Sequence, residues 1–466
     1  MARNADGADD FATLFADADI FHASAVPPYV VWGATGIKLL RRIEGLVAQR
    51  LQPLGYEEIR LPTLCRQREM VRYLGPGAQK LLRVASGRDP ALVLAPFSDI
   101  QFLHHVQAQA RQRRRSKLPH QAYAWSRCFL NERGRGFFDF GEYAKCEIFS
   151  IHASRRAAVA AWEGVNASLA ALCREDLCLD PLCGTRPGIT TFPFAERTFS
   201  AELGQGRDGF QTLLVSHLME SGFTVRNGFV DLKDAWMNSA CFSQKLLAAL
   251  LLHHRDADGF RYPPALAPAL IVAIGVPQID PQTARRERIR PQRKDKDPYR
   301  AMVETGAICA LTRNSHGKWL LYRRGLPKEP PSRHASWKAA LLEAKAYLKA
   351  FALGLREQSR RALETRIAGL ASPPGLELRS AAERDGVNRL LACCNRRPCQ
   401  TRVAELSGWL PKLASGVRET RRCVVCGEVT AGILLLEREE RYTSFYRPRP
   451  FSARHGSETA THPGRP

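Results

Sequence analysis

The chain has 466 residues, of which 45% are hydrophobic and 25% charged, as is typical of a globular protein with two or three domains. Its net charge of +23 exceeds what solubility requires and favours a polyanionic partner such as nucleic acid, although an arginine-rich composition alone is the alternative. The sequence contains neither about 20 consecutive apolar residues nor a basic start followed by an apolar core. We therefore expect no membrane span and no secretory signal.

The thirteen cysteines are an odd number, and most of them are scattered along the chain. This pattern argues against a framework of disulfides, which secreted proteins of small size use to stabilise themselves. We expect a cytoplasmic protein with reduced thiols.

The first half of the chain alternates expected helices and strands. An apolar face with helical spacing predicts a helix at 36–55, formed by Ile37, Leu40, Ile43, Leu46 and Val47. The further expected elements, in chain order, are strands at 56–64 and 91–97, a helix at 98–117, strands at 120–132 and 137–153 joined by an RGRG turn, strands at 210–217 and 228–236, and a helix at 246–252.

A second region begins after the Pro-Pro at 263–264. The continuous apolar run PALIVAIGV at 268–276 is typical of a strand in a sheet that is covered on both faces. After a basic stretch, the pattern predicts two short strands near 308–324 and a long amphipathic helix at 336–367.

Near the C-terminus, four cysteines form two closely spaced pairs, Cys394 with Cys399 and Cys423 with Cys426. Two thiolate pairs on tight turns suit a closed tetrahedral zinc site, and Gly427 allows the second turn to fold back. The spacing therefore predicts structural zinc, with chance retention of thiols as the alternative.

Four stretches of the chain resemble, in their order, motifs of one known family. They are GYEEIRLP at 55–62, LPHQAYAWSRCFLNE at 118–132, FQTLLVSHLMESGF at 210–223, and the segment that begins with NSACFSQK at 238–245. They resemble, respectively, the dimer-interface motif, the second motif, the approach to the amino-acid site and the third motif of class II aminoacyl-tRNA synthetases. With the zinc cysteines, the chain resembles prolyl-tRNA synthetases of the archaeal and eukaryotic type over about residues 28–446.

The resemblance implies an α+β fold. It consists of a class II synthetase-like antiparallel sheet flanked by helices, a small α/β anticodon-binding-like domain and a C-terminal zinc domain. The expected domains are a flexible arm at 1–25, a catalytic domain at 26–265, a reduced anticodon-binding-like domain at 266–380 with a basic linker at 285–300, a zinc-binding domain at 381–446 and a disordered tail at 447–466.

The same resemblance implies ATP with Mg²⁺ as cofactor, tRNA or other RNA as partner, and a homodimer. The family activates an amino acid as its adenylate and then esterifies tRNA. Two arginines, one in each of the last two motifs, grip the phosphate oxygens, since a guanidinium fork binds phosphate bidentately and keeps its proton.

Both arginine positions differ in this chain: Leu130 stands in the second motif and Lys245 in the third. A lysine offers charge to a phosphate but not the fork, and an alkyl chain offers neither. Removing one such donor typically costs about 2.7–4 kcal/mol, or roughly 100- to 1000-fold in rate. Arg133 and Arg135 in the RGRG turn are candidate replacements, and Glu132 would lie near the adenine.

The expected amino-acid site is also altered. The family's Thr-x-Glu corresponds to Phe97, Ser98 and Asp99, and the aromatic-glycine pair before the third motif corresponds to Ala240 and Cys241. The resemblance therefore gives the following candidate substrate-binding residues: Phe97, Asp99, Glu142, Ser216, His217 and Cys241. For each of them, a purely structural role is the alternative.

These substitutions leave several hypotheses open. The first is a diverged paralogue with weak or no proline activation that binds tRNA or a nucleotide or has a regulatory role. The second is an active ATP-dependent ligase that adenylates another amino acid and transfers it to tRNA, a carrier protein or a small molecule. The third is a genuine, divergent proline-tRNA ligase.

Overall fold

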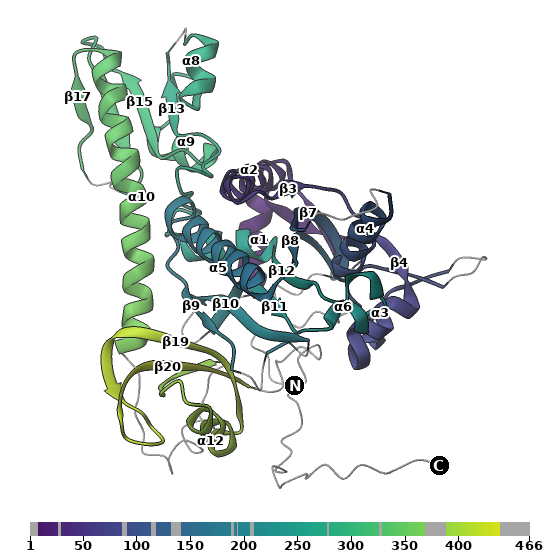
Figure 1. Ribbon diagram of the computed structural model, residues 1–466. Helices are drawn as coiled ribbons and strands as arrows, with labels where there is room; N and C mark the ends of the chain where they lie inside the picture. Colours follow the sequence, from purple (N-terminus) through teal and green to yellow (C-terminus); the bar gives the residue numbers. More distant parts are fainter. Residues whose placement is uncertain are drawn as a thin grey trace, which may run out of the picture.

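The computed structural model describes residues 8–26, 29–85, 91–112, 118–131, 141–187, 191–192, 194–205, 209–276, 279–325, 329–368 and 388–438. Within these residues, ten strands form one large sheet at the centre of the molecule (Figure 1). Neighbouring strands are antiparallel, except β3 and β7, which are parallel. From edge to edge they are β18 (Asn388–Ala392), β20 (Val429–Arg438), β19 (Trp409–Arg422), β9 (Leu182–Thr185), β10 (Ala195–Gln205), β11 (Gly209–Met219), β12 (Trp236–Ser243), β8 (Glu142–His152), β7 (His120–Phe129) and β3 (Glu57–Glu58).

Helices cover both faces of this sheet, because its strands carry apolar side chains on both faces. On one face, Phe102 of α4 (Asp99–Gln112) stacks on Phe149 of β8, with ring centroids 4.9 Å apart. On the other face, Asn238 of β12 donates a hydrogen bond to the carbonyl of Ala158 in α5 (Arg155–Ala171). Since successive side chains on a strand alternate between faces, odd-numbered residues of β8 face α4.

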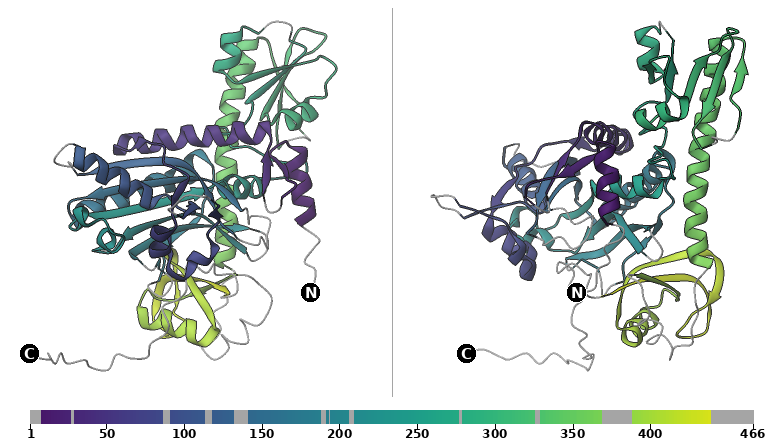
Figure 2. Two further views of the ribbon diagram at one scale, coloured as in Figure 1. Left: turned by 90° about the vertical axis from the view of Figure 1, so that its right-hand side faces the viewer. Right: turned by 180° about the vertical axis from the view of Figure 1, so that it is seen from behind.

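The helix α2 (Ala34–Leu51) crosses above one end of the sheet (Figure 2). The sequence predicted this helix, but only part of its buried face. Leu39, Ile43 and Val47 are buried, whereas Ile37 is exposed. These buried residues are spaced four apart along one face of the helix, whereas the predicted set also included residues of a neighbouring face.

A five-stranded sheet lies in the chain between β12 and β18 of the large sheet, and its strand β13 is parallel to both of its neighbours. All four residues of β13 are buried, as the apolar run had predicted. Its strands, from edge to edge, are β14 (Ile289–Gln292), β13 (Ile271–Ile274), β15 (Cys309–Arg313), β16 (Trp319–Arg323) and β17 (Ser332–His334). The long helix α10 (Trp337–Ala368) packs beside this sheet and continues to β19 and β20 (Figure 1).

The remaining elements are short. The helices are α1 (Ala8–Asp17), α3 (Gln67–Leu74), α6 (Phe223–Arg226), α7 (Lys245–His253), α8 (Pro281–Arg286), α9 (Pro298–Thr305) and α12 (Arg397–Ser407). The remaining strands are β1 (Phe21–Ala23), which pairs with β2 (Val30–Trp32), and β4 (Leu64–Arg66) and β5 (Arg83–Val84), which flank β6 (Leu92–Leu94). In the described part of the chain, no helix is both long and apolar enough to cross a membrane.

The N-terminal segment differs from the flexible arm expected at 1–25. Residues 8–23 form α1 and β1, and the side chains of Phe15 and Ile20 are fully buried. Phe15 packs against Phe260, with ring centroids 4.9 Å apart. This aromatic contact, distant in sequence, is the reason that an acidic segment with little local signal is folded.

The basic segment at 285–300 differs from the expected linker. It contains the end of α8, the strand β14 and the start of α9. Asp280 and Asp297 cap the two helices by accepting hydrogen bonds from backbone N–H groups, which are 2.7 and 2.8 Å away. The segment is therefore an edge of the five-stranded sheet.

The expected strand at 228–236 is also wrong. Val230–Leu232 forms a short 3-10 helix, and the strand β12 begins only at Trp236. The polar stretch NSACFS is itself the strand, and Lys245 then opens α7. The expected junction between a strand and a helix at Lys245 is confirmed.

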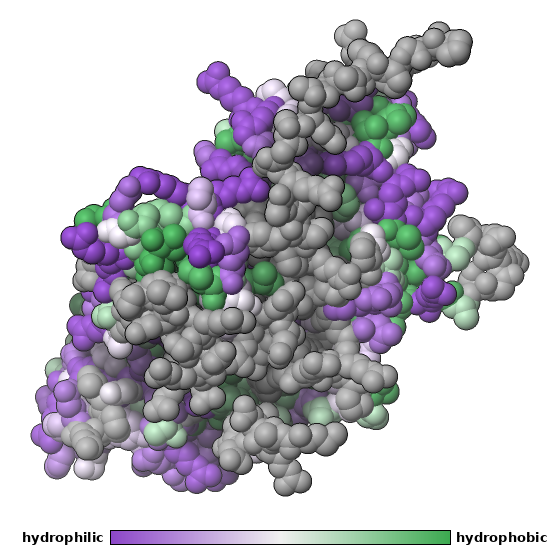
Figure 3. Space-filling model, turned by 90° about the horizontal axis from the view of Figure 1, so that it is seen from below, coloured by the Kyte–Doolittle hydropathy of each residue, from purple (hydrophilic) through white to green (hydrophobic). Residues whose placement is uncertain are grey.

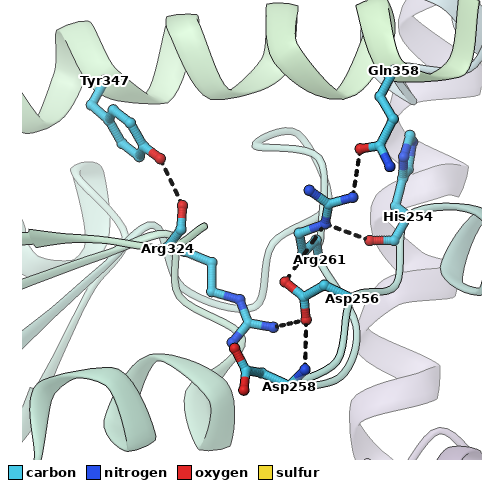
Figure 4. A network of polar contacts seen from close by, with 7 residues as sticks. All are labelled: His254, Asp256, Asp258, Arg261, Arg324, Tyr347 and Gln358. Atoms are coloured by element: carbon cyan, nitrogen blue, oxygen red, sulfur yellow. Dashed lines mark hydrogen bonds and ion pairs between the residues drawn. The ribbon is translucent and has the colours of Figure 1, made fainter. Parts of the chain in front are cut away.

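A polar network joins the end of α7, the five-stranded sheet and α10 (Figure 4). Asp256 accepts a hydrogen bond from Arg324 at 2.7 Å and lies 3.8 Å from Arg261. Arg261 in turn donates to Gln358 of α10 at 2.6 Å. The network thus ties the segment after α7 to two parts of the chain that lie 68 and 97 residues further on.

A second network joins the C-terminal strands to the large sheet. The carboxylate of Glu202 in β10 is fully buried, 3.2 Å from the ammonium of Lys412 in β19 and 3.9 Å from the guanidinium of Arg186. Thr212 donates to the same carboxylate at 2.9 Å. Because two buried cations share one anion, Glu202 holds the C-terminal strands on β10.

We predict that Glu202→Gln lowers the free energy of unfolding by about 3–5 kcal/mol, because it leaves two buried cations without their anion. Chemical denaturation followed by circular dichroism measures this change. The matched control is Glu405→Gln, which removes an exposed carboxylate on α12 and should change stability by less than about 1 kcal/mol. Equal effects of the two substitutions would show that the buried network does not stabilise the fold.

Candidate active site and metal centre

The centre of the candidate active site lies on the face of the large sheet that α4 covers. Lys145 of β8 pairs with Ser126 of β7 and Ser243 of β12, and Glu147 pairs with Cys241 of β12. Directly paired residues of neighbouring antiparallel strands point to the same face. The register therefore brings the side chains of Lys145, Glu147 and Cys241 together.

The segment that leads into α4 lies over these strands. The backbone N–H of Ser98 donates to the Glu147 carboxylate at 3.1 Å, and the Ser98 hydroxyl donates to that of Ser126 at 3.1 Å. These contacts place Phe97 and Asp99 beside Glu147. The structure thus brings together three of the predicted substrate-site residues: Phe97, Asp99 and Cys241.

Lys145 and Glu147 form the charged centre of this group. The Lys145 ammonium lies 3.4 Å from a Glu147 oxygen and 4.1 Å from the centroid of the Phe97 ring. Lys145 is 8% exposed and Glu147 is 2% exposed. Burial lowers the pKa of Lys145, but the Cys241 thiol, Glu147 and other acidic neighbours outweigh this effect and raise it above its usual value. Lys145 is therefore charged.

Asp99 is the second buried acid of the group, with 2% exposure. Burial, and then the negative charge of Glu147, raise the pKa of Asp99 to about 6. One of its oxygens, Oδ1, has no hydrogen-bond partner among the described residues. The carboxylate therefore takes up a proton at a higher pH than an ordinary aspartate does, between about pH 7 and pH 5.

Sequence reasoning missed Lys145 and Glu147. A signal was present, since a lysine and a glutamate interrupt the otherwise apolar strand EYAKCEIFSIH. Their role could not be inferred without the register, because a polar residue in a strand more often faces water.

His217 and Ser216 of β11 point to opposite faces of the sheet. His217 faces the same side as Lys145 and hydrogen-bonds to the Thr198 hydroxyl at 2.9 Å. Burial, followed by the charges of Arg186 and Lys145, lowers the pKa of His217 to about 3, so that its ring is neutral. Ser216 is fully buried on the α5 side and donates to Asn166, away from the other candidate residues.

Lys245 lies at the N-terminus of α7. Its ammonium is 5.1 Å from the ring centroid of Tyr143, which points to the same face of β8 as Lys145. The side chain of Gln244 donates to the carbonyl of Glu142 at 3.1 Å and so fixes the start of α7 on β8. The N-terminus of a helix carries partial positive charge, which adds to that of Lys245.

Leu130, at the position of the second-motif arginine, lies in an apolar environment. Leu130 is 9% exposed and belongs to the main hydrophobic core. The carboxylate of Glu142 pairs with Arg127 of β7. The other expected ATP-site residues, Glu132, Arg133 and Arg135, lie outside the described residues.

The four predicted zinc ligands converge in the C-terminal region. The sulfur atoms of Cys394, Cys399, Cys423 and Cys426 all lie within 4.8 Å of one another. Gly427 has φ of +73° and lets the turn after Cys426 fold back, as expected. Four thiolates at this separation match the donor set of a tetrahedral metal site.

The backbone prepares one of these thiols for a metal. Burial raises the pKa of Cys423, but backbone N–H groups of Cys426, Cys394 and Val425 outweigh this effect and lower it to about 6. Cys393 is buried and donates to the Cys394 carbonyl, outside the cluster. None of the thirteen cysteines forms a disulfide, and the structure describes all of them.

No family model matches the chain. It is 26% identical to a proline-tRNA ligase of Rhodopirellula baltica over 270 residues, which are 54% of this chain and 52% of that protein. It is 24% identical to a proline-tRNA ligase of Erythrobacter litoralis over 360 residues, which are 68% of each chain. The matched part thus spans about half the length of the first relative and two thirds of the second.

Solved structures show the same fold over nearly the whole chain. The prolyl-tRNA synthetase of Giardia lamblia in complex with prolyl-adenylate superimposes with a TM-score of 0.75, at 14% identity, over 93% of this chain and 98% of that chain. The enzyme of Cryptosporidium parvum with L-proline and AMP gives 0.74, at 13% identity, over 92% and 94%. In sequence this chain is similar to proline-tRNA ligases, and its fold is like that of prolyl-tRNA synthetases.

Proposed function

We propose that this chain is a diverged prolyl-tRNA synthetase-like protein with weak or no proline activation, which binds tRNA or a nucleotide. The observation that carries the proposal is Leu130, buried in the apolar core at the position where the resemblance implies an arginine. A buried alkyl side chain cannot stabilise the charge that develops on a phosphate. Lys245 alone supplies charge, without the fork that binds two oxygens.

Nucleotide binding is supported by the N-terminus of α7. The ammonium of Lys245, the first-turn N–H groups and the helix dipole together favour a phosphate there. ATP with Mg²⁺ would supply the phosphates and the charge that bridges them. The residues that would hold the adenine in this proposal include Glu132, with Arg133 and Arg135 as further phosphate ligands.

Binding of RNA is supported by the charge of the chain and by the edge of the five-stranded sheet. The segment around β14 exposes five basic side chains: Arg285, Arg286, Arg290, Arg293 and Lys294. Figure 3 shows that hydrophilic side chains also gather along the rim of the face seen from below. The resemblance adds a homodimer and a cytoplasmic location to this proposal.

A second candidate is an active ATP-dependent ligase for another acid. Lys245 keeps a cation at the start of α7, and two buried carboxylates remain, Glu147 of β8 and Asp99 at the start of α4. These features also suit an enzyme whose substrate has changed. A genuine proline-tRNA ligase is the third candidate, supported by the relatives' names and opposed by Leu130.

We predict that ATP–pyrophosphate exchange with proline stays near background. The assay should include all twenty amino acids, because exchange with one other amino acid would establish the altered ligase, and exchange with proline would refute the proposal. If any amino acid supports exchange, Lys245→Ala should lower the exchange rate by roughly 100- to 1000-fold. The matched control is Lys349→Ala on the exposed face of α10, which should leave the rate unchanged.

Binding of tRNA should weaken steeply as salt rises, because basic side chains release counterions from the phosphates. We predict that the double substitution Arg290→Ala and Arg293→Ala weakens binding and reduces the slope of log K against log salt by about 1–2. Filter binding at several salt concentrations measures both quantities. A slope equal to that of the control Lys233→Ala, which removes an exposed charge near α6, would count against β14 as the RNA surface.

We propose zinc as the occupant of the cysteine cluster, with about one ion per chain. Cys423→Ser should release the metal, because it replaces a ligand thiolate with a poor donor. Cys309→Ala is the matched control, since this buried thiol lies in β15, away from the four-cysteine cluster. Metal analysis of the purified proteins measures the zinc content of each. Absence of zinc from the unsubstituted protein would refute the proposed zinc site.

A further inference from the structure

Lys145, Glu147 and Asp99 form a charged cluster that the established likeness does not explain. Two of its members are acids and one is an ammonium, and none is more than 8% exposed. The cluster is nevertheless not sealed in the core. The side chain of Lys145 is 10% exposed, and its neighbours Phe97 and Cys241 are half-buried.

Lys145 offsets the charge of one of the two acids without any ligand. Glu147 contributes a negative charge, and Lys145, at 3.4 Å, contributes a positive one. Burial and the charge of Glu147 raise the pKa of Asp99 to about 6, which shifts this acid toward its protonated form. A buried carboxylate needs a nearby cation or a proton, and here the chain supplies both.

The Lys145 ammonium also makes the contacts that the ammonium group of a ligand would need. It lies against the Phe97 ring at 4.1 Å, which is a favourable position for a cation over an aromatic face. It also approaches the Glu147 oxygen that accepts the Ser98 N–H. A second ammonium that approached either acid would meet the first at a few ångströms in a region with little water, where like charges repel strongly.

Resting on the proposed function, we propose that Lys145 determines the specificity of this site: it is the resident counter-ion of the two acids, and it excludes ligands that carry an ammonium group. The site would instead take a ligand whose corresponding group is an uncharged hydrogen-bond donor, such as a hydroxyl. Asp99 Oδ1, which is buried without a hydrogen-bond partner among the described residues, is the acceptor for that donor. The chain therefore selects against the common form of an amino acid.

The test compares proline and alanine, which carry ammonium groups, with lactate, which carries a hydroxyl in place of the ammonium of alanine. Binding to the full-length chain is measured by calorimetry without ATP or tRNA. The unsubstituted protein should bind lactate more tightly than alanine. Lys145→Met should bind proline and alanine at least about 10-fold more tightly than the unsubstituted protein does, because the two acids then lack their counter-ion.

Three further variants make the result specific. Lys145→Met combined with Glu147→Gln should lose most of the gained affinity for proline, since the carboxylate that Lys145 pairs with is gone. Lys145→Gln repeats the test with a polar side chain in case the methionine variant does not fold, as judged by circular dichroism. Lys349→Met removes an exposed lysine of α10 and should bind like the unsubstituted protein.

Saturable binding of proline to the unsubstituted protein, with the same affinity as to Lys145→Met, would overturn the inference. So would an unchanged preference between alanine and lactate in the folded variants. The outcome is separate from that of the exchange assay. Exchange with proline would refute the proposed lack of proline activation whatever the binding test shows, whereas failure of the binding test would refute only the role of Lys145.

Discussion

The antiparallel register of β8 between β7 and β12 is the constraint on which the candidate site depends. It fixes Lys145 opposite Ser126 and Ser243, and Glu147 opposite Cys241. A shift of one residue would turn every one of these side chains to the face covered by α5. Cys146 and Ile148, the apolar residues that alternate with Lys145 and Glu147 along β8, would then leave the core on the α5 side. The register that buries the core is therefore also the register that places the charges.

Local patterns predicted many of the elements that surround this site. The strands β7, β8, β13, β15 and β16 and the helices α7 and α10 follow their sequence signals, because apolar alternation or helical spacing extends over the whole element. The cysteine pairs were equally informative, since a metal site depends on spacing in the chain. The structure brings all four sulfur atoms together.

The failures have a common cause in contacts between distant residues. Strand β14 consists of the residues IRPQ, which carry no strand signal, and it forms because Ile289 pairs with Ile271 of β13. The helix α1 is held by Phe15 against Phe260. Strand β12 contains Asn238 and Ser239, whose small polar side chains are buried on opposite faces of the sheet. In the candidate site, the chain's own lysine was missed for the same reason, since its partners come from three other segments.

The long helix α10 limits how the chain can be shortened. Its 32 residues extend about 48 Å, and its last turns carry Leu363 and Ile367, which pack against β19 and β20. A chain that ended before β18 would leave this apolar end bare and would open the edge of β9 to other strands. Loss of the strands β18, β19 and β20 should therefore make the remaining chain prone to aggregation.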